Sequence, residues 1–218
     1  EFFLRELYDG DAASNTLSWR WVAGIQTKGK NYIAQNWNIN KFTDNRYKDL
    51  KLIENPQPIM DQREYKISPI SFSDNEKASD RLVFFENELD FKIYNIDSYK
   101  KVYCILLSNE ERQVKLGNKV LEYKKNLIKN QIQNLSLKIE FITGKKFIEL
   151  SSNEKDFDVV YPSVGENMSF LKKIMKRNNL TVSYLNRDED KFCWQFSNKG
   201  YFNFKLNIPK ILSELKIN

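Results

Sequence analysis

The pattern of apolar and polar positions changes along the chain, and from residue 81 onward it alternates between two periods. Short apolar runs rich in β-branched and aromatic residues are separated by segments with helical spacing, which is typical of strands joined by helical crossovers. Four or five strands are readable, and the sequence therefore predicts an α/β domain with a mostly parallel sheet. The candidate strands are residues 82–85, 102–107, 137–142, 157–161 and 180–185.

Three helices are predicted within this α/β region. A helix after Gly165 runs through Phe170 and Ile174, and another spans residues 208–215 with Pro209 in its first turn. The longest lies between the second and third strands and is expected to pack broadly on the sheet. Its stripe consists of Val114, Leu121, Ile128, Ile132 and Leu135, widened by Leu116, Val120 and Leu127.

The first 80 residues show a different organisation. Residues 1–24 are interpreted as helix, turn and helix, with Gly10 in the turn and Asp11 as an N-cap. From residue 26 to 80 the periodicity fades while polar residues and three prolines accumulate, which indicates a loop or linker with short pieces of order. The pattern thus divides the chain into residues 1–45, a linker over 46–80, and the α/β domain over 81–218.

Composition places the chain among soluble globular proteins. It has 218 residues, of which 41% are hydrophobic and 29% charged, and its mean hydropathy is −0.62. No apolar run is long enough to span a bilayer, and the start lacks the features of a signal peptide, so we expect a cytoplasmic protein without a membrane partner. Because the chain begins with Glu1 inside an amphipathic segment, we expect it to be a fragment of a longer protein.

Two residue types narrow the chemistry. The chain contains no histidine and two cysteines, which excludes histidine-dependent hydrolase triads and a structural zinc site from these residues. Cys104 and Cys193 lie in apolar runs and are expected to be buried, reduced thiols. The net charge is +6, and residues 81–218 carry 24 Lys and Arg against 17 Asp and Glu. This excess of positive charge favours a polyanionic partner such as nucleic acid. A general bias toward Lys and Asn along the whole chain explains the excess equally well.

The segment from Asp9 to Gly24 carries the candidate chemistry. Asp9 and Asp11 stand at a helix start, where carboxylates can accept hydrogen bonds from the hydroxyl or ring N–H groups of a polar ligand. On the following helix Asn15 and Trp19 are four residues apart and share a face, whereas Trp21 is turned by about 200° from Trp19. Small residues at positions 12–14 and 23 would let a bulky planar ligand approach the backbone.

This order of residues strongly resembles the end of the flavin-binding domain of the DNA photolyase and cryptochrome family. The family motif is Asp-Gly-Asp, three small residues, Asn, and then Trp-x-Trp-x-Ala-Gly, and each part is present here at the matching spacing. The resemblance covers about forty residues, from Leu4 to Phe42. It implies that residues 1–45 are the C-terminal part of an α-helical FAD-binding domain, followed by the α/β domain.

The resemblance also implies a role for each residue of the motif. Asp9 and Asp11 would bind FAD, and Asn15 would lie beside the flavin N5. Trp19 would be the flavin-proximal member of the tryptophan chain that photoreduces FAD, and Trp21 would line the cavity that receives the flipped pyrimidine dimer. The implied partner is damaged DNA, and the implied enzyme is a photolyase-like lyase that splits pyrimidine dimers by light-driven electron transfer from reduced FAD.

The segment departs from the family pattern at Thr16-Leu17-Ser18, where Asn-Gly-Gly is more usual, and in the loop of residues 28–36. The helices that precede the motif in the family are not in this chain, which alone would hold at most half a flavin pocket and be inactive. A cryptochrome-type blue-light photoreceptor without repair activity is the alternative, and a non-catalytic α/β interaction domain is a third. The cyclobutane dimer and the (6-4) photoproduct both remain open as substrates.

The second half has weaker signals. Residues 143–146 are too short for a phosphate loop and indicate a turn with solvated lysines. Residues 162–167 join a strand to a helix N-terminus, where open α/β sheets bind anions or cofactors, although the connection alone requires such a loop. By analogy the α/β domain is an antenna-like module. A packed aromatic core is favoured over base stacking for Trp194, Phe196, Tyr201, Phe202 and Phe204.

Overall fold

The computed structural model describes residues 33, 35–51, 55–59, 77–92, 94–135, 138–162, 164–197 and 201–216. The chain divides into two units, one holding helix α3 (Asn36–Phe42) and the other holding the strands. Helix α3 is a short piece of order within the segment expected to be loop. Among the described residues, no helix has the length and apolar character needed to cross a membrane.

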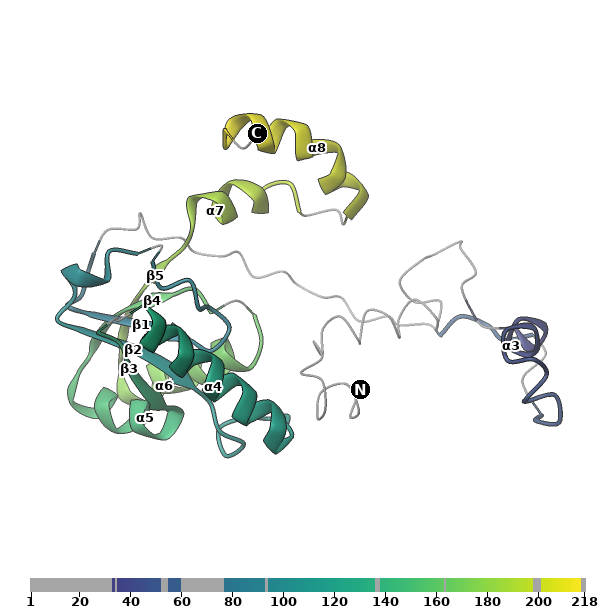
Figure 1. The fold of residues 1–218 in the computed structure, drawn as a ribbon, viewed down its shortest axis with the longest axis horizontal. Helices are drawn as coiled ribbons and strands as arrows, with labels where there is room; N and C mark the ends of the chain where they lie inside the picture. Colours follow the sequence, from purple (N-terminus) through teal and green to yellow (C-terminus); the bar gives the residue numbers. More distant parts are fainter. Residues whose placement is uncertain are drawn as a thin grey trace. The chain divides into compact units, whose positions relative to one another are not determined.

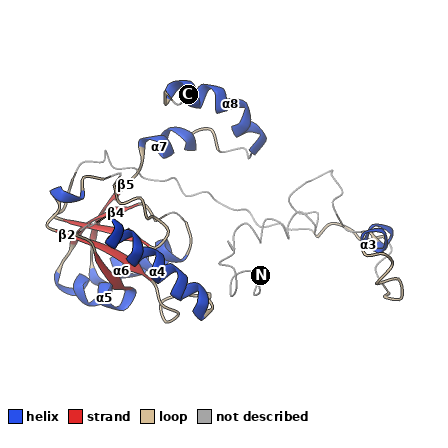
Figure 2. Ribbon diagram, in the orientation of Figure 1, coloured by secondary structure: helices blue, strands red, loops and turns tan. Residues whose placement is uncertain are grey.

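The second unit is built on a five-stranded sheet in which every pair of neighbours is parallel (Figure 2). The spatial order is β3-β2-β1-β4-β5. This confirms the predicted mixed α/β class with a parallel sheet and the approximate position of each strand. The strands are β1 (Arg81–Phe85), β2 (Lys101–Leu106), β3 (Glu140–Thr143), β4 (Asp156–Val160) and β5 (Thr181–Leu185).

Three long helices cover the two faces of this sheet (Figure 1). Ile128 of α4 (Asn118–Asn134) packs into one core cluster, whereas α5 (Gly144–Asn153) and α6 (Glu166–Asn178) contribute Phe147 and Leu171 to the other. The chain proceeds outward from β1 through β2 to β3, and then returns so that β4 pairs with the free side of β1. The strand order therefore reverses between β1 and β4, which is the switch point of a doubly wound sheet.

Strand β1 lies at the centre of both core clusters. Its residues alternate between them, with Val83 and Phe85 in one cluster and Leu82 and Phe84 in the other. All four side chains are fully buried. A strand covered on both faces reads as a continuous apolar run, which is why the sequence located β1 closely.

The helices differ from the sequence expectation in extent. Helix α4 begins four residues after Val114, and both Val114 and Leu127 are exposed, so the predicted apolar stripe is wrong at these two positions. The side chains it buries, Val120 and Ile128, form a narrower stripe. Helix α8 (Tyr201–Glu214) begins seven residues before the predicted start, which puts Pro209 inside the helix rather than in its first turn. One backbone hydrogen bond is lost at that proline, yet the helix continues.

Two helices were missed. The predicted turn at residues 143–146 is the start of α5, where the Thr143 hydroxyl accepts a hydrogen bond from the Lys146 amide as an N-cap. The cap overrides the turn signal of Gly144. Helix α7 (Asp188–Trp194) has three acidic residues in its first turn, a favourable position for negative charge.

The two cysteines are both free of disulfides. Cys104 is buried as predicted, and burial raises the pKa of its thiol, ahead of a smaller effect from the charge of Glu86. Cys193 is only half-buried, so the expectation of a buried thiol is wrong there. It belongs to the short helix α7, none of whose residues is fully buried.

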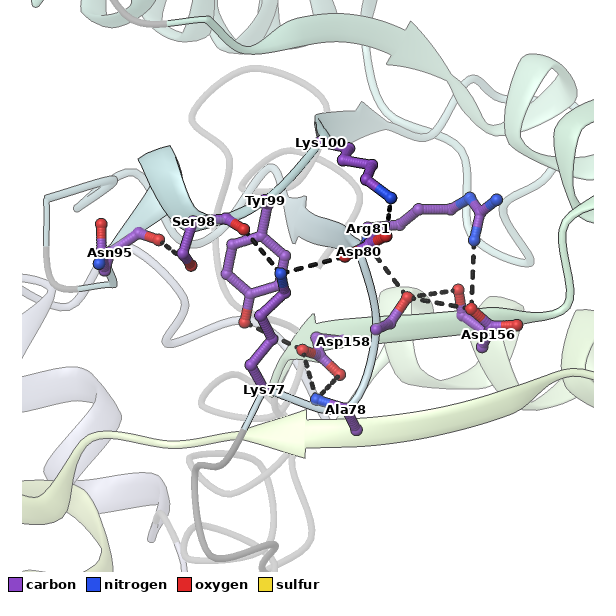
Figure 3. Close-up of polar contacts among 11 residues, drawn as sticks. Lys77, Ala78, Asp80, Arg81, Asn95, Ser98, Tyr99, Lys100, Asp156 and Asp158 are labelled. Atoms are coloured by element: carbon purple, nitrogen blue, oxygen red, sulfur yellow. Dashed lines mark hydrogen bonds and ion pairs between the residues drawn. The ribbon is translucent and has the colours of Figure 1, made fainter.

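A cluster of polar contacts holds the segment that precedes β1 against the sheet (Figure 3). The fully buried carboxylate of Asp158 on β4 accepts hydrogen bonds from the Ala78 amide, at 3.1 and 3.3 Å, and from the Tyr99 hydroxyl, at 2.9 Å. Lys77 donates to the carbonyl of Ser98, the last residue of the 3-10 helix η1 (Ile96–Ser98). Burial and then the bond to Asp158 raise the pKa of Tyr99, so its hydroxyl remains a donor. The segment before β1 is thereby held against β4.

Candidate functional site

A cavity of about 210 Å³ opens at the carboxyl ends of β1, β4 and β5. It is lined by residues that directly follow these strands, among them Glu88, Tyr161 and Arg187. The position coincides with the reversal of strand order between β1 and β4. In open parallel sheets the loops diverge at this point and leave a crevice in which ligands bind.

Aromatic side chains form one wall of this carboxyl-edge cavity. The rings of Tyr161 and Trp194 lie 5.5 Å apart between centroids at an interplanar angle of 72°, and Tyr161 also contacts Tyr184 edge to face at 5.7 Å. Edge-to-face packing holds such rings in defined orientations. The contact also attaches α7 to the end of β4, because Trp194 is the last residue of that helix.

An ion pair crosses the cavity from the end of β5 to the loop after β1. The guanidinium of Arg187 contacts the carboxylate of Glu88, with both side chains partly buried. Burial by itself would lower the pKa of Arg187, but the charge and hydrogen bond of Glu88 raise it overall. A charge-assisted pair in a sheltered position holds these two strand ends together.

The hydroxyl oxygen of Tyr94 and Nε of Arg187 are buried in the cavity wall without a hydrogen-bond partner among the described residues. Burial, followed by the charge of Glu88, raises the pKa of Tyr94 to about 12, so the hydroxyl is protonated near neutral pH and can donate a hydrogen bond. Buried donors without partners are costly, so an acceptor-bearing ligand placed here would relieve that cost.

The connection from β4 to α6 lies where the sequence predicted, and several polar groups of its described residues, 162 and 164–167, already have partners. The Asn87 amide donates to the Pro162 carbonyl at 2.9 Å, and the Asn167 amide donates to Asn87 at 3.0 Å. Gly165 has φ of 130°, which favours glycine. The carboxylate of Glu166 accepts from the amides of residues 113 and 114 and places negative charge in the first turn of α6. This arrangement disfavours an anion at the start of α6.

The residues predicted to bind FAD and damaged DNA lie outside the described residues, and the structure therefore does not place them. They are Asp9, Asp11, Asn15, Trp19 and Trp21.

The aromatic run toward the C-terminus departs from the predicted packed core. Trp194 and Phe196 are half-buried, but Tyr201 and Phe202 are 65% and 77% exposed, so that prediction is wrong for these two residues. Tyr94 and Arg187 were not singled out from the sequence. The only signal that could have indicated Arg187 is that polar residues directly follow the last strand.

No protein-family model, curated protein or solved structure compared with this chain matches it. In the described part of the chain, no group of three or more Cys, Asp or Glu residues is placed to hold a metal ion.

Proposed function

We propose that this chain is part of a photolyase-like flavoprotein that repairs pyrimidine dimers in DNA with light. The observation that carries the proposal is the string from Asp9 to Gly24, in which two carboxylates, an amide and two indoles follow one another at the family spacing. Single members of the string have ordinary structural roles, but their joint order is specific. The histidine-free composition is compatible with this reaction, because electron transfer requires no acid–base triad.

The chemistry of this donor set fits FAD. Carboxylates at Asp9 and Asp11 can accept hydrogen bonds from the hydroxyls of the cofactor, and the Asn15 amide offers both a donor and an acceptor to a ring nitrogen whose protonation changes. Trp19 is an oxidisable electron donor, and Trp21 offers a face on which a flipped base can stack. Reduced FAD, when bound, supplies the electron that opens the dimer under light.

The proposal predicts dimer repair by the full-length gene product. Oligonucleotides containing a cyclobutane dimer or a (6-4) photoproduct are mixed with the flavin-loaded, reduced protein, and intact bases are counted by chromatography after illumination. Loss of one lesion in the light and none in the dark supports a photolyase. A protein that carries flavin and photoreduces it but leaves both lesions intact is the blue-light photoreceptor instead, and a protein without flavin contradicts both functions.

We also propose that the α/β unit is an antenna-like module that holds a planar chromophore in the carboxyl-edge cavity. The aromatic wall of Tyr161 and Trp194 offers stacking or edge contacts, and the Tyr94 hydroxyl and Arg187 Nε offer donors to ring nitrogens or carbonyl oxygens. The volume of about 210 Å³ limits the buried part of the ligand to a small ring system.

This second proposal predicts a small molecule that absorbs visible or near-ultraviolet light and leaves the purified protein on acid extraction, in addition to FAD. Trp194→Ala should release this molecule, whereas Trp194→Phe should retain it because an aromatic wall remains. Thermal melts show whether each variant is folded. Extraction of FAD alone, or equal retention by folded Trp194→Ala, would count against the antenna-like role.

A further inference from the structure

We propose that the outer face of α6 is a docking surface for the phosphate backbone of DNA. The surface, here called the α6 cationic stripe, consists of Lys172, Lys173, Lys176 and Arg177, all of which are exposed. Positions 172 and 176 lie about 6 Å apart along the helix axis, as do 173 and 177. The stripe therefore presents two parallel rows of positive charge to solvent.

The cations of the α6 cationic stripe have no acidic partners within the described residues. Three other arginines of the α/β unit, Arg81, Arg112 and Arg187, each form an ion pair with a carboxylate. Arg177 forms none within that part of the chain, and neither do the three lysines of the stripe. Arg177 is therefore the one arginine among the described residues of the α/β unit that forms no salt bridge within them.

Helix stability does not explain the stripe either. Lys176 and Arg177 lie in the last turn, where positive charge is favourable to the helix dipole. Lys172 and Lys173 are farther from that end, and each stands four residues before another cation, a spacing at which like charges repel. The arrangement opposes folding slightly, so a polyanion that neutralises it would gain binding energy.

In the described part of the chain, acidic groups lie beside two cations of the stripe but form no ion pair with them. Glu166 begins the helix, 11 positions before Arg177, and its carboxylate is held by the amides of residues 113 and 114. Glu110 and Glu111 line a groove of about 310 Å³ between α5 and α6, together with Glu166 and with Lys145, Lys173 and Arg177. Glu111 already accepts a hydrogen bond from the Ser108 amide, and Glu149 pairs with Lys146.

The chemistry of the stripe favours a nucleic acid over an anionic membrane. A membrane-surface helix inserts an apolar face as well as its charges. The apolar residues of α6, including Phe170, Leu171 and Ile174, are buried against the sheet, and the only other exposed residue of this helix is Ser169. DNA phosphates, in contrast, bind surface lysines and arginines by charge alone, with one phosphate per about 3.4 Å of each strand. The inference takes DNA as partner from the proposed function, but it concerns contacts that do not require a lesion.

The test compares two triple variants of the full 218-residue chain that lose the same charge. The stripe variant carries Lys173→Gln, Lys176→Gln and Arg177→Gln. The control carries Lys125→Gln, Lys129→Gln and Lys138→Gln, which are exposed positions on and after α4, the helix on the opposite face of the sheet. Binding of a short, labelled, undamaged DNA duplex is followed by fluorescence anisotropy from low to physiological salt.

The stripe variant is expected to lose about tenfold or more in affinity, and its plot of log K against log salt should flatten by about 2 to 3, since each phosphate contact contributes about 0.9. The control should bind within about twofold of the unaltered chain with an unchanged slope, because the contacts are local rather than a matter of net charge. Equal losses in both variants, or none in either, would overturn the proposal. Because the substituted side chains are exposed, thermal melts should stay unchanged.

Vesicles of phosphatidylserine and phosphatidylcholine provide the competing test. Vesicle binding that depends on the stripe, together with unchanged DNA binding, would assign this surface to membranes and reject the proposal. Undamaged DNA separates the outcome from that of the repair reaction. If the chain binds duplex DNA through the stripe but the full-length protein repairs no lesion, this inference is supported and the proposed function is contradicted. If the protein repairs lesions but the stripe does not contribute to DNA binding, the proposed function is supported and this inference is contradicted.

Discussion

Trp19→Phe is expected to abolish photoreduction of the flavin in the full-length gene product while leaving FAD bound. A benzene ring nearly fills the space of the indole, so the pocket should keep its shape, but it is much harder to oxidise and cannot pass an electron to the excited flavin. The measurement is bleaching of the oxidised flavin absorption band under blue light with an external thiol as reductant. Flavin content, determined on the denatured protein, should match that of the unaltered protein.

Trp21→Phe is the matched control. Trp21 points about 200° away from Trp19 on the same predicted helix, so its loss should weaken binding of a dimer-containing oligonucleotide without slowing photoreduction. Normal photoreduction by Trp19→Phe would show that the assigned electron route is wrong. If both variants lost their flavin, the two residues would be structural and the role of each would have to be reassigned.

Arg112→Met is expected to cost the α/β unit about 3 kcal/mol or more in free energy of unfolding. The guanidinium of Arg112 contacts the Glu86 carboxylate directly after β1, and the two side chains are only 5% and 3% exposed. Glu86 also accepts a hydrogen bond from the Leu107 amide at 2.9 Å, and Lys124 lies 3.9 Å away. Removing Arg112 therefore leaves a buried carboxylate with one distant cation. Urea unfolding followed by circular dichroism measures the loss.

A double variant separates the charge from the packing. Glu86→Gln together with Arg112→Met removes both charges while retaining an acceptor for the Leu107 amide, so it should recover more than half of the stability that the single variant loses. Lys101→Met serves as the exposed comparison, because its pair with Glu154 at 2.7 Å is half in solvent and should change stability by less than about 1 kcal/mol. A loss below about 1 kcal/mol in Arg112→Met would contradict the assignment of a buried pair.

Elements that are buried on both sides were predicted better from the sequence than elements that are partly exposed. The strands were located because a parallel strand covered on both faces is apolar at nearly every position, as at residues 82–85 and 102–106. The helices were predicted less well. The apolar residues of helix α5 lie among lysines and serines, which weakens the helical pattern. The start of this helix is marked by an N-cap hydrogen bond to the hydroxyl of Thr143. Helix α8 continues past Pro209, although proline is usually found only in the first turn of a helix.

One of the two candidate sites could be predicted from the sequence, and the other could not. The motif of Asp9, Asp11, Asn15, Trp19 and Trp21 could be recognised because its members lie close together in the sequence, and it stays a prediction. The carboxyl-edge cavity could not have been found this way. Glu88 and Arg187 are 99 residues apart, and their pairing depends on β1, β4 and β5 being neighbours. Strand order is not encoded in the periodicity of any one segment.

The sequence by itself thus determined the class of the second unit, the positions of its strands and the residues from which a flavin-dependent function is proposed. These properties depend on local periodicity and on residue order, which can be read along one segment at a time. The tertiary structure alone decided the reversal of strand order at β1, the buried partners of Glu86 and Asp158, and the exposure of the cations on α6. Each of those depends on contacts between segments distant in the chain, whose pairing is set by how the whole core is packed.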